Sequence, residues 1–175
     1  MQAMVVYESL WGNTAAIARA VAEGFGPEAR ALSTAQATAS ELANADLIVA
    51  GAPVMGFRLP TDKMRETLGR TPDRSTRPPD LSHPSMRSWL DTLPVGRGHS
   101  AAFETRFWWS PGGSTSEIIA RLRCAGYRQL LKPQRFIVLA THGPLREGET
   151  QRAREWGERL AEAMQASSAR AAVRP

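Results

Sequence analysis

The chain has 175 residues, 42% of them hydrophobic, and a formal net charge of +5. These values predict one compact domain with a substantial core. No apolar run approaches the roughly 20 residues that a membrane span needs. The sequence does not open with a basic segment followed by an apolar signal region, so we expect a cytoplasmic protein. The single cysteine, Cys124, cannot form an internal disulfide, and we expect a half-buried structural thiol.

The positive excess lies in residues 61–175, mainly as arginines spread over loops and helices. It forms no basic block, and no RNA- or DNA-binding motif accompanies it. We therefore expect solvated charged faces and no nucleic-acid partner.

The most informative stretch comes first. An apolar run, Met4–Tyr7, stops at Glu8, and a short loop leads into residues 15–25, whose apolar positions have helical spacing. This pattern predicts a buried strand, a tight turn and the start of a helix.

That turn has the features of an anion site. A helix N-terminus presents free N–H groups and the positive end of a dipole. Gly12 permits close backbone approach, and Ser9, Asn13 and Thr14 add side-chain donors. Neither a Gly-Lys-Ser/Thr ending nor a G-x-G-x-x-G pattern is present, which excludes two other phosphate loops. A ligand-free helix cap stays open as an alternative.

The middle of the chain continues the alternation of strands and helices. The predicted elements are a weak strand at 29–33, a helical turn at 40–45, a strand at 46–51, a shaped loop at 51–60, a helix at 61–68 and a short helix at 85–93. We expect residues 70–84, which are polar and rich in proline, to form a flexible surface excursion.

The last part of the chain adds two strands and two helices. The predicted elements are a strand at 99–105, a helix from residue 114, a strand at 135–140, an exit loop at 141–145 and a helix at 147–165. We expect a single domain over 1–166 and a disordered tail at 167–175.

Five strands that alternate with helices predict an α/β fold, a doubly wound five-stranded parallel sheet with helices on both faces. Ligands bind such sheets beyond the carboxyl ends of the strands. Three loops with glycine or aromatic residues follow the first, third and fourth strands, and a strand order of 2-1-3-4-5, the order of the family that the chain is compared with next, would bring them to one crevice.

At this point the chain resembles the flavodoxin family, over nearly its whole length. The likeness rests on Tyr7–Thr14 (Tyr-Glu-Ser-Leu-Trp-Gly-Asn-Thr), on Gly51 and Pro53, on Ala102–Arg106, and on Gly143–Leu145 before an acidic, Trp-bearing last helix. The resemblance implies a flavodoxin-like fold and FMN as the cofactor.

The resemblance also implies which residues bind FMN. The phosphate would be held by Ser9, Leu10, Trp11, Gly12, Asn13 and Thr14. One side of the isoalloxazine ring would be lined by Pro53, Val54, Met55, Gly56 and Phe57. The other side would be lined within 105–114, by Thr105, Arg106, Phe107, Trp108, Trp109, Gly112 and Gly113. Apolar and aromatic side chains suit a flat ring.

Several aromatic residues need individual interpretation. Trp11 replaces a small hydroxyl residue of many flavodoxins, which removes one phosphate donor. We expect one of Trp108 and Trp109 to be exposed or to face the ligand. His142 is interpreted as a solvated loop residue, and we assign Trp89 and Trp156 to the core.

The basic charge is a second departure, because electron-carrying flavodoxins are typically acidic around the flavin. Arg106 and Arg58 lie in loops that would face the ring. We hypothesise that a nearby guanidinium favours the anionic reduced flavin and two-electron chemistry.

The functional prediction is an FMN-binding redox protein, with no metal site and no catalytic side chain beyond the flavin. It would serve a redox partner protein as an electron carrier, or reduce a small quinone- or porphyrin-type acceptor as an oxidoreductase. The alternative is a cofactor-free interaction module on the same scaffold. A phosphotransfer receiver is excluded, because no acidic pair follows the first strand and the third lacks an acceptor Asp.

Overall fold

A computed structural model describes residues 1–70 and 77–172. In chain order the elements are β1 (Ala3–Tyr7), α1 (Asn13–Phe25), β2 (Ala29–Ser33), α2 (Ala39–Leu42), β3 (Leu47–Pro53), α3 (Asp62–Arg70), α4 (Met86–Asp91), β4 (His99–Arg106), α5 (Thr115–Cys124), β5 (Arg128–Gln129), β6 (Gln134–Ile137) and α6 (Glu149–Ala172).

The strands form one parallel sheet in the order β2-β1-β3-β4-β5, which confirms the predicted order 2-1-3-4-5. The fifth position is occupied by two short strands. β5 pairs with residues 99–100 of β4, and β6 pairs with residues 103–106. The strand expected at 135–140 is therefore shorter and begins earlier. Pro133, which has no N–H group, lies in the gap between β5 and β6.

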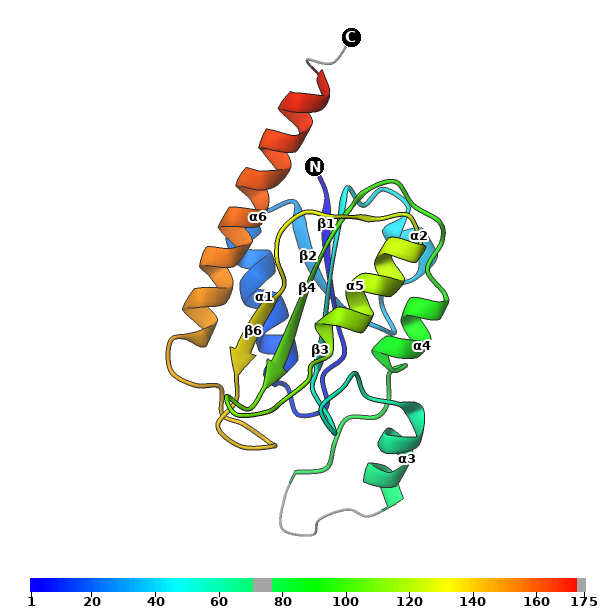
Figure 1. Ribbon diagram of the computed structural model, residues 1–175, viewed down its shortest axis with the longest axis vertical. Helices are drawn as coiled ribbons and strands as arrows, with labels where there is room; N and C mark the ends of the chain where they lie inside the picture. The colour runs from blue at the N-terminus through cyan, green and yellow to red at the C-terminus, as the bar shows by residue number, and fades with distance from the viewer. Residues whose placement is uncertain (71–76, 173–175) are drawn as a thin grey trace.

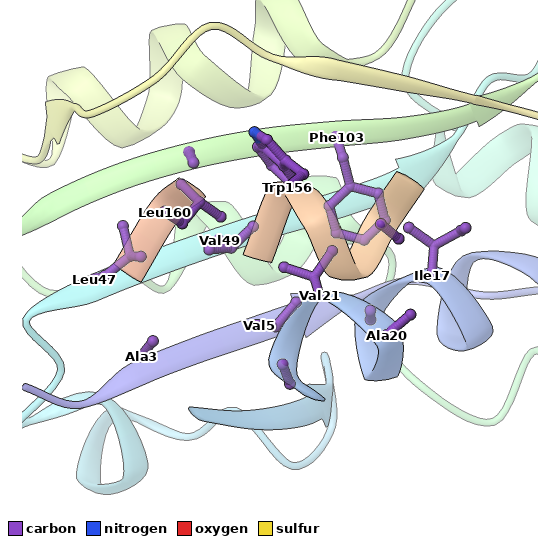
Figure 2. Packing of buried hydrophobic residues seen from close by; sticks show 14 of the residues in the cluster. Ala3, Val5, Ile17, Ala20, Val21, Leu47, Val49, Phe103, Trp156 and Leu160 are labelled. Carbon is purple, nitrogen blue, oxygen red and sulfur yellow. The ribbon is translucent and has the colours of Figure 1, made fainter. Parts of the chain in front are cut away.

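Helices cover both faces of the sheet, as predicted. Figure 1 shows α1 and α6 on one face and α2, α4 and α5 on the other. Alternate residues of each strand point to opposite faces. Val5, Val49 and Phe103 pack against α1 and α6 (Figure 2), whereas Val6 and Ala50 pack on the opposite side.

The two tryptophans assigned to the core are indeed buried. Trp156 of α6 belongs to the cluster around Phe103, and Trp89 of α4 belongs to the cluster on the other face. Cys124 is exposed rather than half-buried, because it lies on the solvent side at the end of α5.

The structure differs from two predictions, one for the C-terminal tail and one for the loop at 70–84. Helix α6 continues through residues 167–172, where we expected a disordered tail, since this alanine-rich stretch has high helix propensity. Residues 173–175 lie outside the described part of the chain. So do residues 71–76 of the expected excursion at 70–84, while residues 77–84 lie against the loop that follows β1.

Across residues 1–70 and 77–172, none of the helices combines the length and the apolar character needed to cross a bilayer.

Candidate functional site

The loop between β1 and α1 presents its backbone N–H groups at the start of a helix. Gly12 has a φ of 93°, a conformation that glycine adopts without strain, and its N–H donates to the Ser9 hydroxyl at 3.1 Å. The N–H groups of Trp11, Asn13 and Thr14 have no acceptor among the described residues. They are the donors that a helix N-terminus leaves for an anion.

The loop after β3 makes a tight turn. The backbones of Met55 and Arg58 exchange two hydrogen bonds of 3.0 and 3.1 Å across Gly56 and Phe57. Phe57 has a φ of 66°, which is uncommon for a bulky residue, and its ring is half exposed. Such backbone strain concentrates at functional sites.

The loop after β4 is tied to that turn. Gly113 donates its N–H to the Phe57 carbonyl at 3.0 Å, and Val54 donates to the Thr105 carbonyl at 2.9 Å. A Cβ at Gly112 would lie 2.1 Å from the Phe57 carbonyl oxygen, so only glycine allows this approach. The two loops therefore form one wall of the site.

The first loop joins the other two through a pair of hydroxyl groups. Thr14 at the start of α1 and Thr105 near the end of β4 are both buried, and their hydroxyl oxygens lie 2.8 Å apart. One hydroxyl donates to the other, which leaves a single hydroxyl proton free for a ligand.

A cavity of about 120 Å³ lies where the three loops meet. Its lining includes eleven of the predicted site residues: Ser9, Leu10, Trp11, Asn13, Thr14, Pro53, Val54, Met55, Thr105, Arg106 and Phe107. The other predicted residues lie in the same loops but outside this lining: Gly12, Gly56, Phe57, Trp108, Trp109, Gly112 and Gly113. Their binding roles stay predictions.

Exposed aromatic side chains surround the mouth of these loops. Trp108 is 77% exposed and Trp109 is 57% exposed, so neither is a core anchor. Trp109 stacks in parallel on Phe107, with ring centroids 5.5 Å apart. The Trp11 ring meets the exposed His142 ring edge to face at 4.9 Å.

The charge of Arg106 is largely compensated. Its guanidinium is buried and donates to Glu104 and to the Gly112 carbonyl, each at 2.8 Å. Glu104 also accepts the N–H groups of Ser114 and Thr115 at the start of α5. This pairing weakens the basis for a guanidinium that biases the flavin, and the hypothesised redox preference stays untested.

Sequence reasoning missed three lining residues, Leu68, Val138 and Thr141. Thr141 follows the last strand, so its place at the carboxyl edge was a usable signal. Nothing in the pattern of α3 marks Leu68. The contacts of residues 77–86 with the first loop were also missed, because a polar, proline-rich stretch reads as surface.

Asp80, which lies in the segment 77–86, has a shifted pKa. The Ser82 hydroxyl and N–H donate to the Asp80 carboxylate at 2.6 and 3.0 Å. These bonds lower the pKa of Asp80 below its ordinary value, so Asp80 keeps its negative charge beside the first loop.

Known proteins match this chain in structure only. No family model matches it, and no curated protein does. A flavodoxin from the domain Archaea superposes with a TM-score of 0.64 over 94% of this chain and 99% of its own, at 22% identity. The chain has the flavodoxin-like fold.

Further structures agree with this flavodoxin-like fold. Oxidised flavodoxin 2 from Bacillus cereus matches with a TM-score of 0.63, covering 93% of this chain and 99% of its own at 16% identity. The metal-soaked Flv1 flavodiiron core from Synechocystis sp. PCC6803 has a TM-score of 0.61 and 18% identity; the match covers 95% of this chain but only 36% of that one. These identities establish the fold alone.

Proposed function

We propose that the protein binds FMN and works as a redox protein. The observation that carries this proposal is the meeting of three loops, from the ends of β1, β3 and β4, at one cavity beside unbonded N–H groups of α1. In a scaffold that binds no ligand, we would not expect N–H groups without acceptors, a pair of hydroxyl groups and exposed aromatic rings to gather at the same place.

The loop after β1 would hold the phosphate. The N–H groups of Trp11, Asn13 and Thr14 are donors without acceptors in the described chain. An anion at a helix start also gains from the helix dipole. The enclosed cavity is smaller than the roughly 300–1,000 Å³ of whole-ligand pockets, so we assign to it the phosphate end of FMN.

The other two loops would hold the flat ring. Met55 and Phe107 line the cavity, and Phe57, Trp108 and Trp109 extend this apolar surface outward. Aromatic and thioether groups contact planar rings favourably and exclude water from them. Backbone N–H groups of these loops are available to bond the polar edge of the ring.

The bound flavin would supply electron or hydride transfer. The chain's own residues would bind and orient it and leave one edge open at the exposed aromatic mouth. That opening suits either a redox partner protein or a flat quinone- or porphyrin-type acceptor.

Titration with FMN tests the proposal. We expect one FMN per chain at micromolar concentration or below, with loss of flavin fluorescence as aromatic side chains contact the ring. Riboflavin, which lacks the phosphate, should bind more weakly because it leaves the α1 donors unused. Absence of FMN binding at micromolar concentrations would contradict the proposal and support the cofactor-free interaction module.

A further inference from the structure

Residues 77–86, here called the loop brace, make four hydrogen bonds to residues 8–11. Asp80 donates its N–H to the Leu10 carbonyl at 2.7 Å, and His83 Nε2 lies 3.1 Å from the Ser9 carbonyl oxygen. The Trp11 indole N–H donates to the Arg77 carbonyl at 3.1 Å. The fourth bond runs from the Met86 N–H to the Glu8 carboxylate at 2.8 Å.

These bonds fix the direction of two peptide groups. In a planar trans peptide, the carbonyl of one residue and the N–H of the next point in opposite directions. The brace holds the carbonyls of Ser9 and Leu10, so the N–H groups of Leu10 and Trp11 must point away from it. Leu10 and Trp11 also line the cavity assigned to the phosphate. The brace therefore aims donors into the site.

His83 is the buried centre of the brace, with 7% of its surface exposed. Its Nε2 faces the Ser9 carbonyl, and its Nδ1 lies 3.1 Å from the Pro84 carbonyl oxygen. The Thr34 hydroxyl oxygen lies 3.3 Å from Nδ1 and 2.7 Å from the Pro84 carbonyl oxygen. Nε2 faces a carbonyl oxygen, which can only accept, so Nε2 carries a ring proton and donates it to Ser9.

Arg65 of α3 locks His83 in place. Its guanidinium donates both to the buried Glu8 carboxylate and to the His83 carbonyl. Because Arg65 and Glu8 offset each other, the pair adds no net charge beside the ring. The titratable and charged groups around His83 are Tyr7 of β1, Glu8 directly after β1, Arg19 of α1, Arg65 of α3, and Arg77 and Asp80 of the brace.

We propose that His83, whose ring bonds the Ser9 carbonyl, is a positioning residue of the phosphate site. It orients the loop after β1 and so aims the N–H group of Leu10 into the cavity. The loop has no lysine or arginine of its own, so its affinity for a phosphate depends on how its N–H groups are oriented. This inference rests on the proposed FMN function.

Three variants test this role of His83. His83→Ala removes the donor, whereas His83→Gln keeps an N–H donor. His99→Gln makes the same change at the opposite edge of the sheet and serves as the control. We expect FMN affinity to fall roughly tenfold in His83→Ala and by less in His83→Gln, as for a lost hydrogen bond. Riboflavin affinity should change little in any of them.

A second measurement uses the unmodified protein. Nitrogen NMR of the FMN-loaded chain resolves its three histidines, and comparison with His83→Gln assigns the His83 signals. We expect His83 Nε2 to carry a proton. A bare Nε2, or equal FMN affinity in all three variants and the unmodified chain, would overturn the inference alone. Failure of the unmodified chain to bind FMN would overturn the proposed function as well.

Discussion

At the scale of single residues, the ion pair between Glu8 and Arg65 matters most for stability. The Glu8 side chain is fully buried, and that of Arg65 is 8% exposed. Removing one partner leaves a buried charge without compensation. We expect Arg65→Ala to lower the free energy of unfolding by about 3–5 kcal/mol.

Urea unfolding measures this loss. The control is Arg30→Ala, whose partner Glu41 is exposed, so its loss should stay below about 1 kcal/mol. Similar losses in the two variants would show that burial of the Glu8–Arg65 pair does not matter as argued.

The hydroxyl pair of Thr14 and Thr105 is the residue-scale test of the cofactor site. Valine has nearly the shape of threonine, so Thr14→Val removes a donor and keeps the packing. We expect a roughly tenfold weaker FMN affinity, as for one lost hydrogen bond to a charged group. The exposed Thr92 provides the matched control Thr92→Val, measured by the same fluorescence titration. An unchanged affinity in Thr14→Val would remove this hydroxyl from the site.

His99 makes stability depend on pH. Partial burial, followed by the nearby Arg128, lowers the pKa of His99 below its ordinary 6.5, while Asp46 opposes the shift. The unfolded chain therefore binds this proton more readily. Its contribution to stability is complete above about pH 6.5 and declines as the pH falls below that value. Urea unfolding of His99→Asn should show a weaker loss between neutral and mildly acidic pH; an identical loss would refute the argument.

At the scale of elements, α1 and α6 approach each other closely at glycines. A Cβ at Gly157 would lie 2.2 Å from the Val21 carbonyl oxygen, and one at Gly24 would lie 2.0 Å from the Arg154 carbonyl oxygen. Gly157→Ala must push the helices apart, so we expect a loss of about 1–3 kcal/mol in unfolding free energy.

Gly69 of α3 gives the contrasting helical position. Among residues 1–70 and 77–172, a Cβ there meets only the end of the Leu81 side chain, so Gly69→Ala should be neutral or slightly stabilising in the same urea experiment. A Gly157→Ala protein as stable as the unmodified chain would show that α6 can shift without cost.

The elements that sequence reasoning predicted are those with a strong pattern. Apolar runs predicted β1, β3 and the edge strand that contains β6, and the spacing of Met86, Trp89 and Leu90 predicted α4. The split of the edge strand was missed because the apolar run that predicted this strand lies entirely after Pro133. The residues before this proline gave no such run. The extension of α6 was missed because alanine and serine give no amphipathic stripe.

Part of the candidate site could also be predicted from the sequence. Ser9–Thr14, Pro53–Met55 and Thr105–Phe107 follow strands, so strand order alone brings them together. The brace could not be predicted, because Asp80 and His83 act through main-chain contacts and burial that no local pattern encodes. Long-range contacts of irregular segments depend on the whole fold.

At the scale of the whole molecule, the loops that follow the strands gather at one end, below the sheet in Figure 1. The opposite end carries His99 and the start of β3. The central claim is that the first of these ends, and not the other, binds FMN.

Amide NMR during FMN addition tests that claim most directly. We expect shifted or broadened signals in residues 9–14, 53–57 and 105–113 and near Thr141, with little change around Asp46, His99 and Arg128. Saturable changes confined to the loops would support a single flavin site. Unchanged spectra, or changes centred on the opposite end of the sheet, would contradict it.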